Sequence, residues 1–196
     1  MTAMNRRKFL RGLGGCALIV TTGAFVDQYL KRLPGATVPN EPYDGSTSGT
    51  VKVRIIGPDG KLTAPIEVPK VVKTEAEWRK QLTATQYAIT RDKSTEPAFC
   101  GAFYDNHKEG IYHCVCCNLP LFASGAKFDS GTGWPSFFRT IESGIQRKSD
   151  FKIGIPRTEY HCARCLGHQG HVFDDGPRPT GLRYCNNGVA LSFKVA

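Results

Sequence analysis

The chain has 196 residues, of which 40% are hydrophobic and 22% are charged, and its formal net charge is +9. This length and composition are typical of one globular domain with an appendage, with enough residues to bury a stable core. Four of the basic residues fall within residues 1–26, and the remainder carries no basic run or basic–aromatic stripe, so nucleic-acid binding is not favoured.

Residues 1–26 have the pattern of an export signal. The run from Asn5 to Arg11 (NRRKFLR) contains two adjacent arginines followed by Phe-Leu, and an apolar, glycine-rich run extends from Gly12 to Val26. That run is short for a membrane span but fits the apolar region of a signal. We therefore expect export by the twin-arginine machinery, with the protein periplasmic or anchored outside the cytoplasm by an uncleaved signal. A frayed basic N-terminus with a short apolar helix is the alternative.

Residues 27–49 are rich in Pro, Gly, Ser and Thr, which predicts a flexible linker. Residues 50–73 are expected to form a hairpin extension, because an alternating run from Val51 is followed by a turn at Pro58-Asp59-Gly60. The domain proper is then expected over residues 74–196.

Two short helices are predicted at the start of this domain. Thr74 and Glu77 have the spacing of a capping box that opens a helix containing Trp78, and a second helix is expected around Thr85–Arg91. After Thr95, aromatic, glycine and turn residues dominate without a helical period, which predicts short antiparallel strands. The fold class is therefore mainly β with small N-terminal helices.

The strongest chemical signal is a pair of C-x-x-C motifs. Two such motifs separated by a long insert predict one structural zinc ion with four thiolate ligands: Cys114, Cys117, Cys162 and Cys165. The alternative is that one motif is a redox dithiol of the thioredoxin type, but the βαβ unit that normally carries it is not visible. Cys116 is expected to point away from the metal.

Cys185 has no spacing partner and is the candidate nucleophile. Arg183 is expected to favour its thiolate form, and Asn187 lies close in sequence. A buried structural cysteine is the alternative, because free cysteines are among the most buried residues. His168 and His171 could act as acid–base groups, as core residues or, least favoured, as metal ligands. Asp175 could orient a histidine, hold Arg183 or belong to a simple turn.

Two further features complete the candidate site. Trp134 lies on a Gly/Pro-rich loop, where an indole often lines a pocket, and Trp134 and the following Phe137 are the candidate substrate-binding residues. Cys100 lies in a loop-like context, and elimination of the other cysteines makes it the best candidate for a thiol that forms a disulfide with an oxidised Cys185.

Taken together, the motifs resemble the B-type peptide-methionine (R)-S-oxide reductases. The match spans about residues 74–196 and includes Gly110–Cys114 (GIYHC), Lys127–Phe137 (KFDSGTGWPSF), Arg157–Glu159 (RTE), Gly167–Pro177 (GHQGHVFDDGP) and Gly181–Cys185 (GLRYC).

The resemblance implies two antiparallel sheets arranged as a partly open β-barrel with a structural zinc site. It also implies that Cys185 attacks the sulfoxide sulfur and becomes a sulfenic acid, while His168 and His171 serve in protonating the sulfoxide oxygen. Trp134 would pack against the substrate methyl group, and Asp175, Arg183 and Asn187 would complete the site. The expected partners are oxidised methionine in proteins or peptides and a thioredoxin-like reductant that reduces the resulting disulfide.

This chain departs from the family pattern at three places. Thr132 occupies a position where many members carry the resolving cysteine, which makes Cys100 the main candidate for that role. Gln169 stands where leucine is usual, and Asn186-Asn187-Gly188 replaces Ile-Asn-Ser. Two other classes of function are alternatives: a non-catalytic binding module held together by zinc, and a thiol–disulfide oxidoreductase that needs a metal-free C-x-x-C.

Overall fold

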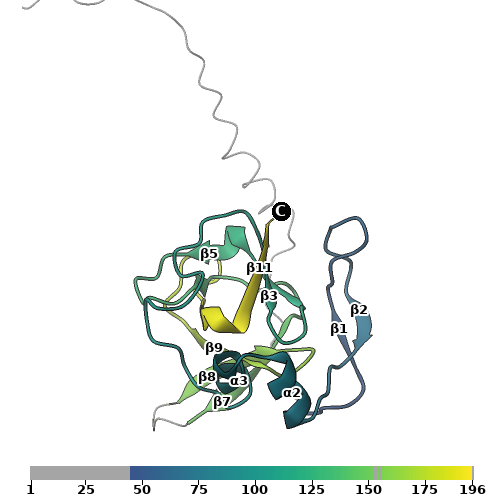
Figure 1. The fold of residues 1–196 in the computed structure, drawn as a ribbon. Helices are drawn as coiled ribbons and strands as arrows, with labels where there is room; N and C mark the ends of the chain where they lie inside the picture. The colour runs from purple at the N-terminus through teal and green to yellow at the C-terminus, as the bar shows by residue number, and fades with distance from the viewer. Residues whose placement is uncertain (1–44, 152–153, 155, 196) are drawn as a thin grey trace, which may run out of the picture. The chain divides into compact units, whose positions relative to one another are not determined.

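A computed structural model describes residues 45–151, 154 and 156–195 (Figure 1). The expected export signal and most of the expected linker lie outside the described residues. Among the residues that are described, no helix is both long enough and apolar enough to cross a membrane.

The described chain is mainly β, with two α-helices, and its strands pair antiparallel in three sheets. A hairpin sheet contains β1 (Thr50–Val53) and β2 (Ile66–Pro69). A three-stranded sheet has the order β11-β3-β4, with bounds Leu191–Val195, Gly110–Cys114 and Pro120–Ala123. A six-stranded sheet has the order β5-β6-β10-β9-β8-β7, with bounds Lys127–Phe128, Ser136–Phe137, Arg183–Asn186, His168–Phe173, Arg157–Cys162 and Ile145–Asp150.

None of these sheets closes on itself. The expectation of two sheets in a partly open barrel is therefore corrected to separate antiparallel sheets, with the predicted hairpin forming a third. The turns η1 (Ser124–Ala126) and η2 (Gly188–Ala190) are short 3-10 helices at the ends of strands.

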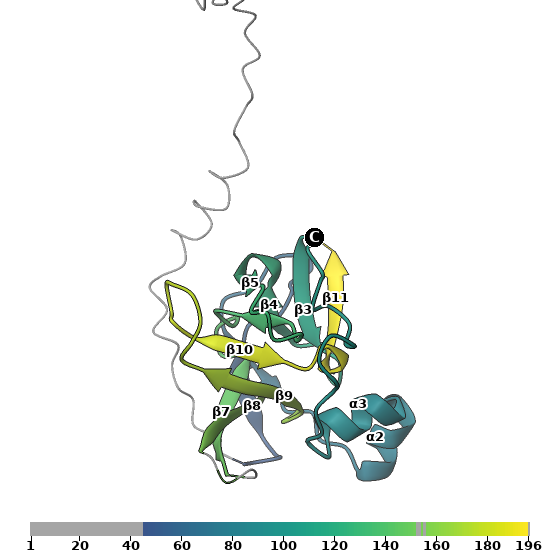
Figure 2. The same cartoon turned by 90° about the vertical axis from the view of Figure 1, so that its left-hand side faces the viewer.

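The two predicted helices are present as α2 (Glu75–Gln81) and α3 (Ala84–Thr90). The capping box at α2 is confirmed: the Thr74 hydroxyl accepts from the Glu77 amide, and the Glu77 carboxylate accepts from the Thr74 amide at 2.7 Å. Thr83 caps α3 in the same way. Helix α3 packs against β9 and η2, which brings it next to the strand that carries the histidines (Figure 2).

The core between the two larger sheets is aromatic. Tyr112 and Phe122 from the three-stranded sheet meet Phe137, Tyr160 and Tyr184 from the six-stranded sheet, and all five are 0% exposed. Phe137 stacks on Phe122 with ring centroids 4.1 Å apart. Phe137 has no accessible surface and anchors β6 in the core, and its contact with substrate stays a prediction.

Candidate active site and metal centre

The four predicted zinc ligands come together at one end of the three-stranded sheet. The sulfurs of Cys114 and Cys165 are 3.6 Å apart, those of Cys117 and Cys162 are 3.5 Å apart, and all four lie within 4.8 Å of one another. A tetrahedral ion with Zn–S bonds of about 2.3 Å holds its sulfurs roughly 3.8 Å apart. The donor set and its spacing therefore fit one zinc ion.

Both halves of this cluster have the same backbone geometry. In each, the first cysteine carbonyl accepts from the amide four residues later, Asn118 at 2.8 Å and Leu166 at 2.9 Å. These two residues have left-handed φ angles of 60° and 57°, which turn the chain back toward its strand. The repeated geometry is that of two zinc knuckles, and it supports metal binding over a redox dithiol.

Cys116 does not point away from this cluster as expected. It is 3% exposed, and its thiol lies beside the sulfurs of Cys114 and Cys165. The hydrogen bond with Cys114 raises the pKa of Cys116 to about 12 and, in return, lowers the pKa of Cys114 to about 6. Cys116 is therefore a fifth buried thiol beside the four-cysteine cluster, a placement that spacing alone did not indicate.

Gln169 forms a second contact with the cluster. Its side chain is 0% exposed, and its amide Nε2 donates to the Cys114 sulfur at 3.5 Å. The amide that replaces the usual leucine thus supplies a hydrogen bond to a predicted zinc ligand. It also connects the metal centre to β9, the strand that carries both histidines.

Cys185 lies in the middle of the six-stranded sheet. On β10 it is paired with His171 of β9 on one side and Ser136 of β6 on the other. Side chains directly opposite each other in an antiparallel pair share a face, with Cβ atoms about 5 Å apart. The fold therefore brings His171 next to the candidate nucleophile.

Burial and charge act in opposite directions on this thiol. Burial raises the pKa of Cys185, while the Arg183 charge and hydrogen bonds with Thr132 and Arg183 lower it, and the net shift is upward. Arg183 lowers the pKa of Cys185, as the sequence predicted, but not enough to ionise the thiol at neutral pH. The nucleophile therefore needs a base nearby to take its proton.

Asp175 holds Arg183 rather than a histidine. Two hydrogen bonds, at 2.8 and 2.9 Å, join the Arg183 guanidinium to the two Asp175 carboxylate oxygens. The guanidinium also lies 4.3 Å from the centre of the Phe173 ring. This bidentate geometry fixes the cation beside Cys185.

A β-bulge puts His168 and His171 on one face. Residues three apart on a regular strand would point to opposite faces, but between β8 and β9 the partners step from His161↔His168 to Tyr160↔Gly170, which leaves Gln169 as the extra residue. The imidazole centres of His168 and His171 are 5.6 Å apart. The bulge thus assembles a histidine pair that strand periodicity would have separated.

Each histidine has its own carboxylate, and neither partner was singled out from the sequence. His168 Nδ1 lies 2.6 Å from the Glu159 carboxylate, which also contacts His161 at 2.9 Å and Lys93 at 3.0 Å. Burial alone would raise the pKa of Glu159, but hydrogen bonds from His161 and His168 hold it well below its usual range. Glu159 is therefore a buried carboxylate that orients His168.

The partner of His171 is Asp150, at the end of β7. His171 Nε2 lies 2.9 Å from the Asp150 carboxylate, which also accepts from Arg157 at 2.5 Å. Burial lowers the pKa of His171, so its imidazole is neutral at neutral pH. A neutral imidazole opposite Cys185 can accept the thiol proton.

Asn187 acts on the backbone around the site. Its side-chain amide donates to the Gln169 carbonyl at 3.1 Å, and its side-chain oxygen accepts from the Glu96 amide at 3.0 Å. The Glu96 carboxylate in turn accepts from the amides of Gly188 and Val189 at 2.5 and 2.9 Å. Asn187 and Glu96 together hold the bulge, η2 and the loop before Cys100.

That loop also contacts the predicted aromatic wall. The indole nitrogen of Trp134 donates to the Glu96 carbonyl at 3.0 Å, and the Phe99 amide donates to the Gly133 carbonyl at 2.9 Å. Cys100 follows Phe99 and is exposed. Thr132, which contacts the Cys185 thiol, precedes Gly133, so the loop that carries Cys100 is hydrogen-bonded to the segment that contacts the nucleophile.

Sequence reasoning missed Glu159, Asp150 and Glu96. Glu159 belongs to the Arg157–Glu159 motif that contributed to the resemblance, and the alternation of β8 could have placed it on one face with His161. Asp150 and Glu96 lie in ordinary polar surroundings, and only the tertiary fold reveals their partners.

Comparisons with known proteins agree on one family. A family model described as SelR domain matches residues 82–195. The chain is 54% identical to a peptide methionine sulfoxide reductase MsrB of Herminiimonas arsenicoxydans, over 63% of this chain and 91% of that protein. An MsrB of Thiobacillus denitrificans is 52% identical, over 62% and 92%. Peptide methionine sulfoxide reductase B1, chloroplastic, of Oryza sativa subsp. japonica is 57% identical over 62% of this chain, but the match spans only 57% of the rice protein.

Proposed function

The chain belongs to the SelR domain family and is a peptide-methionine (R)-S-oxide reductase, and we propose that it reduces its substrate through the Cys185 thiol. The observation that carries this proposal is the pairing of Cys185 with His171, because it puts a neutral base beside a protonated thiol. The substrate would be methionine-(R)-sulfoxide in oxidised proteins and peptides.

In the first step, the Cys185 sulfur attacks the sulfoxide sulfur as His171 takes the thiol proton. The proton is then delivered to the sulfoxide oxygen, and the resulting hydroxyl moves from the methionine sulfur to the Cys185 sulfur. This breaks the substrate S–O bond and the transient S–S bond, leaves the cysteine as a sulfenic acid and releases the methionine thioether. The hydrogen bonds that His171 and His168 donate to the carboxylates of Asp150 and Glu159 support this assignment, because they fix the orientation of both imidazoles. Arg183, held by Asp175, lies beside the reacting sulfur.

In the second step, the Cys100 thiol attacks the Cys185 sulfenic acid, which forms a disulfide and releases water. The exposure of Cys100 and the backbone bond between Phe99 and Gly133 support this role. A thioredoxin-like dithiol would then reduce the disulfide and restore both thiols. Trp134, tied to the Glu96 loop, would provide the aromatic wall against the substrate methyl group.

One zinc ion is proposed at the four-cysteine cluster. Its ligands would be Cys114 and Cys117 of one knuckle with Cys162 and Cys165 of the other. Bound there, zinc would supply a structural crosslink between the three-stranded and six-stranded sheets. It would thereby hold β8 and β9, which carry Glu159 and the histidines, in register with the rest of the domain.

A single-turnover experiment tests the order of the two thiols. The Cys100→Ser variant, given methionine-(R)-sulfoxide without reductant, should yield one equivalent of methionine and a sulfenic acid on Cys185 that dimedone traps for mass spectrometry. The Cys185→Ser variant should yield no methionine. Multiple turnover of Cys100→Ser at the wild-type rate with thioredoxin would remove Cys100 from the mechanism, and substrate binding without any oxidised thiol in wild-type protein would favour a binding module.

Export by the twin-arginine route is proposed from residues 1–26 alone. The adjacent Arg6 and Arg7 and the apolar run that follows support it. Replacing both arginines by lysine should leave the protein in the cytoplasmic fraction, whereas the wild-type chain should be recovered outside the cytoplasm. An identical distribution of the two proteins would contradict the proposal.

A further inference from the structure

The described structure contains a cavity of about 220 Å³ on the side of the metal centre that faces the N-terminal hairpin. Three parts of the chain line it: residues 46–73, the two helices with the segment after them, and the second zinc knuckle. The hairpin extension is fixed to that knuckle, because the Val71 amide donates to the Arg164 carbonyl at 2.8 Å and the Arg164 guanidinium donates to the Pro69 carbonyl at 3.2 Å. The cavity is therefore built partly from residues that precede the SelR domain match.

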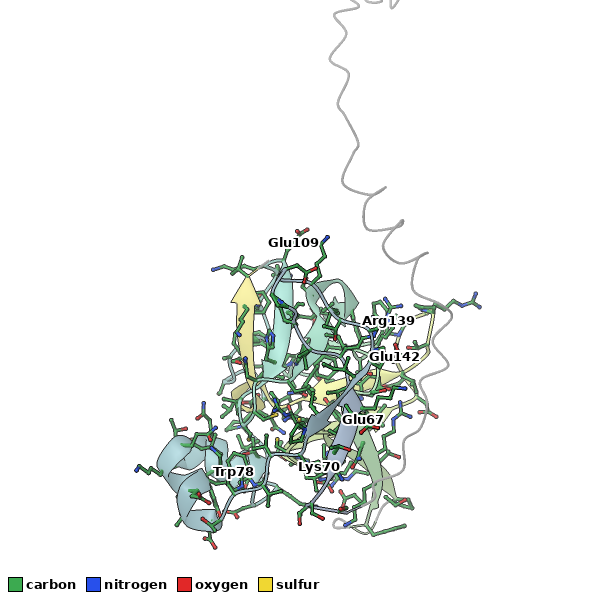
Figure 3. The ribbon with its side chains drawn as sticks, turned by 90° about the vertical axis from the view of Figure 1, so that its right-hand side faces the viewer. Glu67, Lys70, Trp78, Glu109, Arg139 and Glu142 are labelled. Atoms are coloured by element: carbon green, nitrogen blue, oxygen red, sulfur yellow. The ribbon has the colours of Figure 1, made fainter. Side chains whose placement is uncertain are left out.

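The charges that line this cavity have one sign. Its lining contains five basic residues and no carboxylate, the basic residues being Lys70, Lys73, Arg91, Lys93 and Arg164. Of these, Lys93 is paired with the Glu159 carboxylate at 3.0 Å. Figure 3 labels Lys70 and Trp78, two of the residues that line it. A cleft that is lined by cations and has low-dielectric walls concentrates anions from solution.

Three of these cations are bound to neutral groups. Arg91 donates to the Cys165 carbonyl at 3.0 Å, Arg164 bonds the Pro69 carbonyl, and the Lys73 ammonium bonds the Gln81 side chain. Within the part of the chain that the structure describes, no carboxylate lies within ion-pair distance of any of the three. Their positive charges are thus held in place without being neutralised there.

The aromatic floor of the cavity keeps two cations in position. The Arg91 guanidinium lies 4.8 Å from the centre of the Trp78 ring, and the Lys73 ammonium lies 5.2 Å from it. Trp78 is 3% exposed and anchored in the core. Both cations also line the cavity, so a multivalent anion bound there would interact with each of them.

From these observations we infer that the cavity is a binding site for a small multivalent oxyanion of the phosphate class. Guanidinium groups present paired donors that match phosphate oxygens, and lysine adds charge. The volume of about 220 Å³ suits a phosphate group and one or two attached groups. The site is separate from Cys185 and does not depend on the proposed reaction.

Isothermal titration calorimetry of the full-length, reduced protein with inorganic phosphate tests this inference. At neutral pH and low ionic strength, saturable binding of one phosphate is expected, with chloride far weaker. Arg164→Gln and Lys73→Gln should each weaken phosphate binding by about tenfold, since each removes a charged hydrogen-bond donor. Lys108→Gln removes the same charge next to Glu109, far from the cavity in Figure 3, and should leave the affinity unchanged.

The same titration with tripolyphosphate tests whether the site prefers a longer phosphate chain. If the natural ligand carries a chain of phosphates, tripolyphosphate will bind more tightly than phosphate and will be weakened by the same two substitutions. A local folding defect in one variant would not explain a loss of affinity in both, because Lys73 and Arg164 lie in different parts of the chain. Equal affinity in the wild type and both variants, equal loss in the Lys108 control, or no saturable binding of either anion would overturn the inference.

Discussion

Replacing Glu159 by glutamine isolates the contribution of the carboxylate that orients His168. Glutamine has nearly the same shape but no charge, and its amide group turns one acceptor into a donor. In the wild-type protein the Glu159 side chain is 6% exposed and receives contacts from His161, His168 and Lys93 at 2.9, 2.6 and 3.0 Å. The substitution therefore weakens three interactions without opening a cavity.

The expected loss follows from the shortest of these contacts. A hydrogen bond to a charged group contributes about 1.5–3 kcal/mol, and about 1.4 kcal/mol corresponds to a tenfold change. If the bond to His168 must be intact when the sulfoxide oxygen is protonated, kcat should fall by roughly ten- to a hundredfold. KM should change little, because Glu159 is buried and does not reach the substrate.

The assay is steady-state reduction of methionine-(R)-sulfoxide with excess dithiothreitol, which bypasses the recycling partner. Glu142→Gln is the matched control, since Glu142 forms an exposed ion pair with Arg54 at 2.9 Å and lies outside the site. Zinc content and thermal unfolding report whether the variant is still folded. A folded Glu159→Gln protein with wild-type kcat would refute the proposed orienting role.

Three further predictions address other parts of the site. Because burial raises the pKa of Cys185 above the usual range of a cysteine thiol, its alkylation by iodoacetamide, followed by mass spectrometry, should accelerate about tenfold per pH unit from neutral pH upward; a rate that levels off below pH 8 would show that the thiol is already ionised at neutral pH. Arg183→Gln should slow that alkylation further at any pH below the plateau, and an unchanged rate would mean that this cation does not act on the thiol. Chelation of zinc under reducing conditions should expose four additional titratable thiols and lower the unfolding temperature, whereas an unchanged thiol count would exclude a zinc centre.

Local patterns predicted the elements whose stability is local. The capping box at Thr74, the hairpin around Pro58–Gly60 and the two knuckles depend on residues within a few positions of one another, so their sequence signals are sufficient. The sheet arrangement depends on which strands pair across long intervals, and the expectation of a partly open barrel gave way to three sheets. Phe137 illustrates the same limit, because only the packed core shows that its ring is stacked on Phe122.

Some residues of the candidate site could be predicted from the sequence and others could not. Cys185, His171 and Arg183 could be selected from the sequence because thiol, imidazole and guanidinium groups are suited to this chemistry. Glu159, Asp150 and Glu96 could not, since a carboxylate is common on any surface and these three differ only in being buried against specific partners. The bulge at Gln169, which puts the two histidines on one face, is likewise a property of strand register.

The most direct test of the central claim is reduction of separated sulfoxide epimers by the wild-type protein and by Cys185→Ser. The wild-type protein should reduce the R epimer of peptide-bound methionine sulfoxide and leave the S epimer intact, and Cys185→Ser should reduce neither. Comparable activity on the S epimer, or retention of R-epimer activity in Cys185→Ser, would contradict the account.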